Sequence, residues 1–140
     1  MATTKHEVLH PANWKAPKGY ANGIAATGRM VFLGGLIGWN ANRKFESDDF
    51  IEQVKQTLGN ILEVLSEAGG KPQDIVRMTW FITDKQEYLS RQKELGVVYR
   101  AILGKHFPAM SMVQVAALIE DRAKVEIEAT AVIPENSGSD

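Results

Sequence analysis

The stretch of sequence that decides the fold lies in the last third of the chain. It reads Phe107-Pro108-Ala109-Met110-Ser111-Met112-Val113-Gln114-Val115-Ala116-Ala117-Leu118, followed by Val125-Glu126-Ile127-Glu128-Ala129-Thr130-Ala131. In the second segment apolar residues alternate strictly with charged or polar ones, which predicts a strand with one buried face. Pro108 opens the other strand, which we expect to run through Ala117.

Three further strands are expected upstream. Short apolar runs at 24–27 and 30–33 lie on either side of Gly28-Arg29, which predicts a β-hairpin. Gly34-Gly35 then either ends the second strand or lets another backbone approach closely. Residues 75–83 are rich in β-branched and aromatic side chains and predict a strand that lies inside the sheet.

Two helices are expected between these strands. Apolar residues recur at helical spacing from Ile51 to Leu65, and Asp49 with Glu52 forms a capping box at the start. The second helix follows a capping box at 84–87 and ends at Gly104.

The order ββ-α-β-α-ββ predicts an α+β domain, with a mixed β-sheet and two helices packed on one face. The 140 residues fit one domain, 1–140, with its core at about 5–134 and a frayed tail at 135–140. The other sheet face carries Met, Ala and Val residues, and we expect another copy of the chain to bury it.

Composition argues against several classes of function. Sixteen Lys and Arg residues stand against 17 Asp and Glu, and the net charge of −1 predicts neither nucleic acid nor a membrane as partner. The chain has no cysteine, which excludes a disulfide or a thiolate nucleophile. His6, His10 and His106 lack metal-ligand spacing and are expected at the surface, so no metal site is predicted. No signal-like or membrane-length apolar run occurs, and a cytoplasmic location is therefore expected.

Taken together, four segments resemble the YjgF/RidA (reactive intermediate deaminase) family over about residues 18–132. Gly19-Tyr20 with Ile24 is similar to its G-P-Y-S-Q-A-V segment, without the proline, and residues 31–37 are similar to its F-V-S-G-Q-I strand. The helix residues that match the family are Gln53, Thr57, Asn60, Leu65 and Ala68-Gly69. Residues 108–118 and 125–131 match P-A-R-S-x-V-x-V-x-x-L and V-E-I-E-A-x-A, except that Met110 replaces the arginine.

This resemblance implies a chorismate-mutase-like α+β fold and a homotrimer with three ligand clefts between subunits. It also implies hydrolysis of reactive enamines and imines, such as 2-aminoacrylate, to ketones and ammonia. The expected partner is therefore a small-molecule substrate or ligand, and no cofactor is expected. Some family members have been described as ribonucleases, an activity that the net charge of this chain does not favour.

The resemblance also implies a set of site residues. It makes Glu126 the water-orienting catalytic residue, Tyr20 a cleft tyrosine that assists, and Gly35 the cleft glycine. Three other positions depart from the family: Met110 replaces arginine, Met112 replaces cysteine or threonine, and Gly96 replaces asparagine.

These departures change the expected substrate. Arginine binds a carboxylate through two charge-assisted hydrogen bonds, whereas methionine offers only adaptable apolar surface. With Met110 and Met112 on one strand face, the cleft floor should be apolar and a bulkier, more apolar substrate should fit. Arg77 either supplies a relocated positive charge or forms an ion pair with Glu126 or Glu128, and we expect the ion pair.

Several interpretations stay open at this point. Glu126 is either catalytic or part of the polar face of its strand. Trp80 is expected in the core, while Trp39 either stacks on a ligand or covers a loop. The leading hypothesis is an imine or enamine hydrolase with a non-standard, more apolar substrate. The alternatives are a non-catalytic trimer that binds or senses a small molecule, and a specialised pathway enzyme that uses the same intersubunit cleft.

Overall fold

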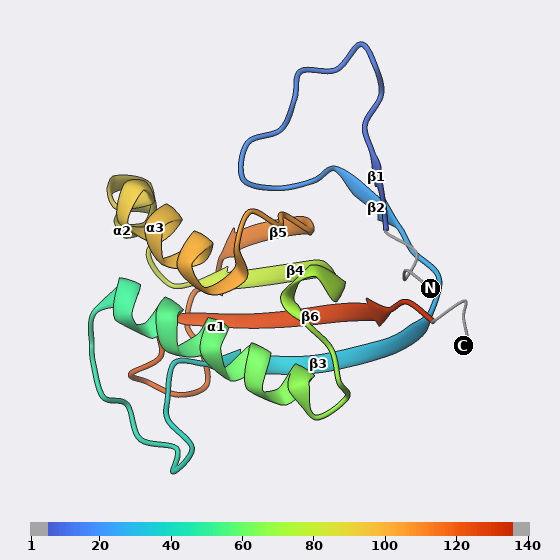
Figure 1. The fold of residues 1–140 in the computed structure, drawn as a ribbon. Helices are drawn as coiled ribbons and strands as arrows, with labels where there is room; N and C mark the ends of the chain where they lie inside the picture. The colour runs from blue at the N-terminus through green and yellow to red at the C-terminus, as the bar shows by residue number, and fades with distance from the viewer. Residues whose placement is uncertain (1–5, 136–140) are drawn as a thin grey trace.

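A four-stranded mixed sheet runs through the centre of the molecule (Figure 1). The computed structural model describes residues 6–135, so most of the tail expected at 135–140 lies outside the described residues. The strands are β3 (Arg29–Ile37), β4 (Ile75–Ile82), β5 (Ala109–Gln114) and β6 (Val125–Ile133), in the order β3-β6-β4-β5. β4 and β5 run parallel, and β6 is antiparallel to both of its neighbours. The alternation of β6 is confirmed, because Val125, Ile127, Ala129 and Ala131 are all buried.

A second, two-stranded sheet corrects the hairpin expected around Gly28-Arg29. β2 (Gly23–Ala25) pairs with β1 (Glu7–Leu9), while β3 pairs along its length with β6 from the far end of the chain. The apolar runs do form strands, but their partners are set by long-range burial, which a local pattern cannot identify.

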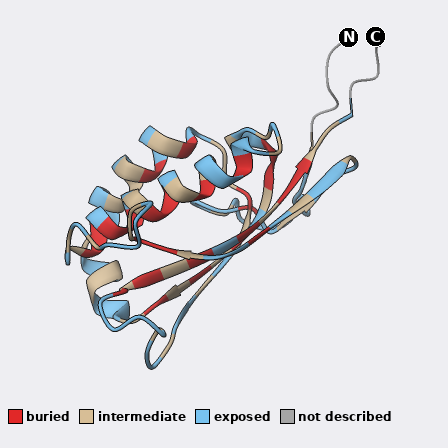
Figure 2. Cartoon of the chain, turned by 90° about the horizontal axis from the view of Figure 1, so that it is seen from below, coloured by how far each residue is buried: buried red, intermediate tan, exposed pale blue. Residues whose placement is uncertain are grey.

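Helices α1 (Phe50–Ser66) and α3 (Gln92–Leu103) cover one face of the central sheet (Figure 2). The second helix is not continuous as expected, because a short α2 (Lys85–Ser90) precedes α3 and Arg91 between them is not helical. The expected cap of α1 is confirmed, since the Asp49 carboxylate accepts a hydrogen bond from the Glu52 backbone N–H. Within residues 6–135, none of the helices is long and apolar enough to cross a membrane.

Cross-strand register divides the sheet residues between two faces. Residues paired across strands point to the same side, and neighbours along a strand point to opposite sides. The helix-facing side carries rows such as Leu36, Ile127, Trp80 and Met112, which belong to the core or pack against it. The outer side carries rows such as Phe32, Thr130, Arg77 and Ala109.

The outer face of the sheet is left uncovered by helices (Figure 2). Phe32 is 71% exposed and Met30 is 58% exposed, both on β3, and Val113 on β5 is 45% exposed. Large apolar side chains gathered on a sheet face in this way are typical of a surface that another protein surface covers.

Polar side chains on the buried side of α1 fasten the ends of two strands. The Gln53 amide donates to the backbone carbonyls of Ser47 and Arg122 and accepts from the Lys124 N–H, at 2.8 to 3.1 Å. About two turns further along α1, the Asn60 amide donates to the Ile37 and Trp39 carbonyls at the end of β3. α1 therefore fixes the end of β3 and the start of β6 together.

Replacing Gln53 by leucine should lower the free energy of unfolding by about 1–3 kcal/mol, because three backbone groups lose their partner in a fully buried position. Urea denaturation measures the change. Gln56→Leu, on the same helix and half-buried, is the control and should cost less. Equal stabilities of the two variants would contradict a special role for the Gln53 amide.

Asp49 should make stability depend on acid pH. The hydrogen bond from Arg91, at 2.6 Å, is the main cause that holds the pKa of Asp49 below its usual value. Because the pKa is lowered on folding, the stabilisation is present above the unfolded value of about 3.9 and is lost as the pH falls through the folded value. Asp49→Asn keeps a capping side chain but removes the negative charge that pairs with Arg91. The variant should therefore be less stable than the parent at pH 7. The two urea midpoints should converge as the pH falls through the lowered pKa of folded Asp49. A difference that does not change with pH would show that the charge of Asp49 contributes nothing.

Candidate functional site

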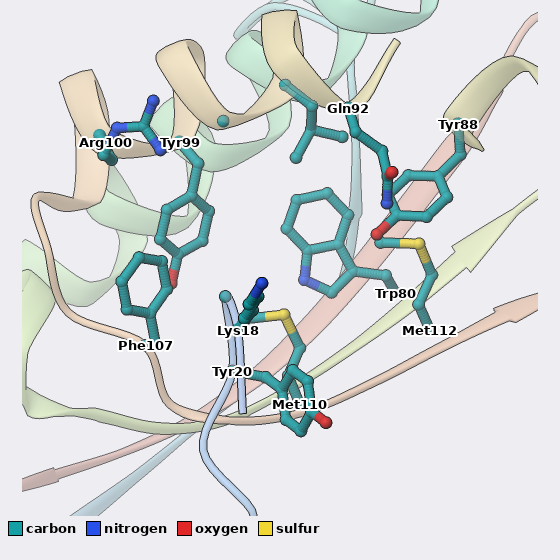
Figure 3. Close-up of a pocket in the computed structure, with 13 residues that line it drawn as sticks. Lys18, Tyr20, Trp80, Tyr88, Gln92, Tyr99, Arg100, Phe107, Met110 and Met112 are labelled. Atoms are coloured by element: carbon teal, nitrogen blue, oxygen red, sulfur yellow. The ribbon is translucent and has the colours of Figure 1, made fainter. Parts of the chain in front are cut away.

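A pocket of about 360 Å³ opens at the β5 edge of the sheet, under α3 (Figure 3). Its floor comes from the helix-facing side of β4 and β5, where Trp80 is paired with Met112 and Met78 with Met110. Met110, Met112 and Trp80 line the pocket, and the two methionine side chains are half-buried. The predicted apolar character of this strand face therefore agrees with the pocket floor.

One wall of the pocket is built from α3. Gly96 lies on this wall, and a side-chain carbon placed on it would be 3.2 Å from an Arg100 guanidinium nitrogen. The absence of a side chain at Gly96 thus leaves the room in which Arg100, one turn later, lies. The Tyr99 ring stacks on Phe107 with centroids 5.3 Å apart and planes at 7°.

The hydroxyl of Tyr99 is already committed within the protein. It donates to the His106 carbonyl at 2.7 Å, and burial raises the pKa of Tyr99. His106 is itself half-buried, with its Nε2 atom 2.6 Å from the Ile75 carbonyl oxygen, which corrects the expectation of a surface histidine. Tyr99 therefore contributes an aromatic surface to the pocket and has no free proton to offer.

The segment around Tyr20 forms the mouth of the pocket. Ala21 forms a bridge to Ala109 alongside β5, and its N–H donates to the Pro108 carbonyl at 3.0 Å. This contact carries Lys18, Gly19 and Tyr20 to the pocket edge, where Tyr20 is 43% exposed. Figure 3 shows Lys18, Tyr20 and Met110 on the same side of the Trp80 indole.

The indole nitrogen of Trp80 is a buried donor with no partner. Trp80 is 1% exposed, and its Nε1 atom forms no hydrogen bond within residues 6–135. Figure 3 shows this nitrogen turned toward Lys18 and Met110. A buried donor without an acceptor is costly, and such a group in a pocket wall calls for an acceptor from outside the chain.

Glu126 lies on the opposite face of the sheet from this pocket. It is paired with Phe81 on β4 and Ile37 on β3, and its carboxylate lies directly over Gly35. A side-chain carbon on Gly35 would overlap the Glu126 carboxylate, with the carboxyl carbon only 2.9 Å away. Gly34, next to it, has open space at the same position. Gly35 therefore interrupts β3 with a small depression that receives the Glu126 side chain.

Comparison with known proteins decides the family. A family model described as endoribonuclease L-PSP matches residues 11–133. The chain belongs to this family. A relative from Escherichia coli K12, named 2-iminobutanoate/2-iminopropanoate deaminase, is 34% identical over 116 residues, which cover 81% of this chain and 86% of the relative.

Solved structures of Rid-family proteins agree with the fold. YyfB of Yersinia pestis, described as a Rid protein of unknown function, superposes with a TM-score of 0.82 at 27% identity, covering 93% of this chain and 100% of that one. The Escherichia coli protein TdcF, solved with bound serine, gives 0.65 at 34% identity and covers 84% and 91%. The resemblance to the YjgF/RidA family and the α+β class are thus confirmed.

Within this Rid-family chain the expected site residues fall into two groups. Four of them line the pocket under α3, at its floor, wall or mouth: Tyr20, Gly96, Met110 and Met112. Trp80, which was expected in the core, is buried there and also lines the pocket. Glu126 and Gly35 lie together on the outer sheet face. One subunit does not bring the two groups together, because the sheet itself separates them.

Arg77 and Trp39 lie outside the pocket. Arg77 is paired with Ala109 on the outer face, and the side chain makes no ion pair within the part of the chain that the structure describes. The expected ion pair with Glu126 or Glu128 is therefore not formed. Trp39 follows β3 and packs against Phe45, with ring centroids 5.8 Å apart.

Sequence reasoning missed much of the pocket wall. The lining residues that were not predicted as site residues are Lys18, Gly19, Trp80, Tyr88, Gln92, Leu95, Tyr99, Arg100 and Phe107. The sequence did indicate that Arg100 lies near the predicted site residue Gly96, because the two are four residues apart and therefore share one helix face. Nothing in the sequence shows that this face meets the β5 edge.

Proposed function

We propose that the chain is a cofactor-independent imine or enamine hydrolase that works as a homotrimer. Its substrate would be bulkier and more apolar than the small 2-imino acids of the relative named above. Membership of the Rid family supports the reaction type, and the observation that carries the proposal is the Glu126 carboxylate held over Gly35. A partly buried carboxylate on an open sheet face is suited to hold a water molecule and move a proton.

The need for a second subunit follows from the two faces of the sheet. The pocket under α3 opens at the β5 edge, whereas Glu126 lies on the outer face. When the outer face of one copy packs against the β5 edge of another, Glu126 of one subunit can complete the pocket of its neighbour. The exposed Phe32, Met30 and Val113 side chains support burial of that face.

The proposed reaction needs little more than positioning and proton transfer. Water adds to the carbon of the C=N bond, the nitrogen takes up a proton, and the carbinolamine collapses to a ketone and ammonia. Glu126 would orient the water and accept its proton, and Tyr20 at the pocket mouth would hydrogen-bond the substrate or the water. One water molecule is consumed for each ammonia released, so no oxidant or cofactor is required.

Met110 and Met112 support the proposed change of substrate. A methionine in place of arginine removes a bidentate carboxylate partner from the pocket floor. The floor then favours an apolar group through contact with thioethers and the Trp80 ring.

Glu126→Gln should abolish the ammonia release that the parent catalyses and leave the oligomeric state unchanged. An amino-acid oxidase generates the imines in the assay from alanine and from phenylalanine. The rate of ammonia release is measured and corrected for the rate without the protein. Glu126-dependent release from either substrate supports the hydrolase, and the ratio of the two rates measures specificity. Silence of the parent protein on both would favour a non-catalytic binding protein, and equal rates for parent and variant would remove Glu126 from the mechanism.

Gly35→Ala should reduce the same activity by about tenfold or more, because the added methyl group displaces the Glu126 carboxylate. Gly34→Ala is the matched control, since its added carbon meets no atom within 4 Å. Both variants are assayed at equal concentration after the oligomeric state has been checked by sedimentation. Equal activity of the two variants would contradict a role for the Glu126–Gly35 contact.

A further inference from the structure

The pocket under α3 is positively charged although the chain as a whole is slightly acidic. Its two charged lining residues, Lys18 and Arg100, are both cationic, and the pocket wall contains no Asp or Glu among the described residues. Neither cation forms an ion pair within residues 6–135. Arg91, in contrast, is held by Asp49 and Glu94 at 2.6 and 2.8 Å. Free cations in a concave, partly apolar site attract an anion.

Arg100 is an exposed side chain at the α3 wall of the pocket, with no hydrogen bond to another described residue. It projects from the same helix face as Gly96, and the missing side chain at Gly96 leaves space for the guanidinium. The guanidinium provides a rigid fork of donors that matches a carboxylate. Arg77 cannot take this role in the same subunit, because it points to the outer face of the sheet.

The Trp80 indole N–H adds a neutral donor to the two cations. It is buried and unpartnered in the described chain, and Figure 3 shows it turned toward Lys18 and Met110. Methionine and lysine side chains are flexible, so a ligand that moves them aside gains this hydrogen bond. The ligand therefore carries an acceptor, such as a carbonyl oxygen, in addition to its negative group.

The walls set the remainder of the ligand. The half-buried Tyr88 and Phe107 present aromatic surface, the rings of Trp80 and Tyr99 are almost fully buried in the same wall, and the methionines complete an apolar floor. A volume of about 360 Å³ holds a small molecule with one ring.

We infer that this pocket binds an aromatic 2-oxo or 2-imino acid, with Arg100 as the main partner of its carboxylate and Trp80 Nε1–H as the donor to its oxygen. If this acid is taken as the substrate of the hydrolase, the inference rests on the proposed function. The binding of the acid to the pocket does not depend on that function. Arg100 thus takes over the charge that position 110 lacks.

Calorimetric titration with phenylpyruvate, the oxo acid product expected from phenylalanine, tests the inference. The parent should bind phenylpyruvate more tightly than pyruvate, which lacks the ring, and more tightly than phenylacetone, which lacks the carboxylate. Arg100→Gln should weaken binding by about tenfold or more, and Arg100→Lys should recover part of it. Lys55→Gln, on the exposed side of α1, removes the same charge outside the pocket and should bind like the parent.

Trp80→Phe keeps a ring and removes only the donor, so binding should weaken about threefold to tenfold, with Trp14→Phe as control. If Arg100→Gln bound phenylpyruvate within about twofold of the parent affinity, the inference would be overturned. It would also be overturned if the parent bound pyruvate as tightly as phenylpyruvate. Ammonia release separates the two proposals. Arg100-dependent binding without Glu126-dependent turnover keeps this inference and sinks the hydrolase, whereas turnover unaffected by Arg100→Gln does the reverse.

Discussion

The buried amide of Gln53 is the interaction on which the arrangement of the two site surfaces depends. Its three hydrogen bonds tie α1 to the Ser47 and Arg122 carbonyls and to the Lys124 N–H, and Lys124 lies two residues before Glu126. The Asn60 amide ties the same helix to Ile37, two residues after Gly35. A purely apolar helix face could slide on the sheet, because hydrophobic contact has no direction, whereas paired amides fix one register. The contact between Glu126 and Gly35 follows from that register.

The alternation of side chains along a strand then explains why one subunit holds only parts of a site. Met110 and Met112 face the helices, and Ala109 and Ser111 face outward with Arg77 and Thr79. On β6 the helix-facing positions are filled by core residues, so the acidic Glu126 has only the outer face available. A chain with this pattern cannot bring Glu126 to its own pocket without losing the core. In the proposed trimer, a second copy supplies Glu126 to the pocket and each subunit keeps its core.

Elements whose signal is local were predictable from the sequence, and those that depend on distant partners were not. The caps at Asp49 and Asp84 and the alternation of β6 involve neighbours along the chain, and the structure agrees with them. The hairpin at Gly28-Arg29 failed because β6, about a hundred residues away, pairs with β3. The helix break at Arg91 was not predictable either, because the ion pair that Arg91 forms there is with Asp49, the N-cap of α1. The family motifs named Tyr20, Gly35 and Glu126, but not the cations that complete the pocket.

Position 110 shows how a pocket can exchange one charge for another. An arginine there would stand beside Lys18 and Arg100 in the pocket lining of one subunit, which has no acidic residue among those described, and like charges close together repel one another. Methionine removes that repulsion, while glycine at 96 gives Arg100 its space. In the site inferred above, the cation therefore stands on the helix wall instead of the strand floor, and the floor becomes apolar surface against Trp80. Such an exchange would keep an anion site and leave more room for a ring, so the substrate would change while the fold stays the same.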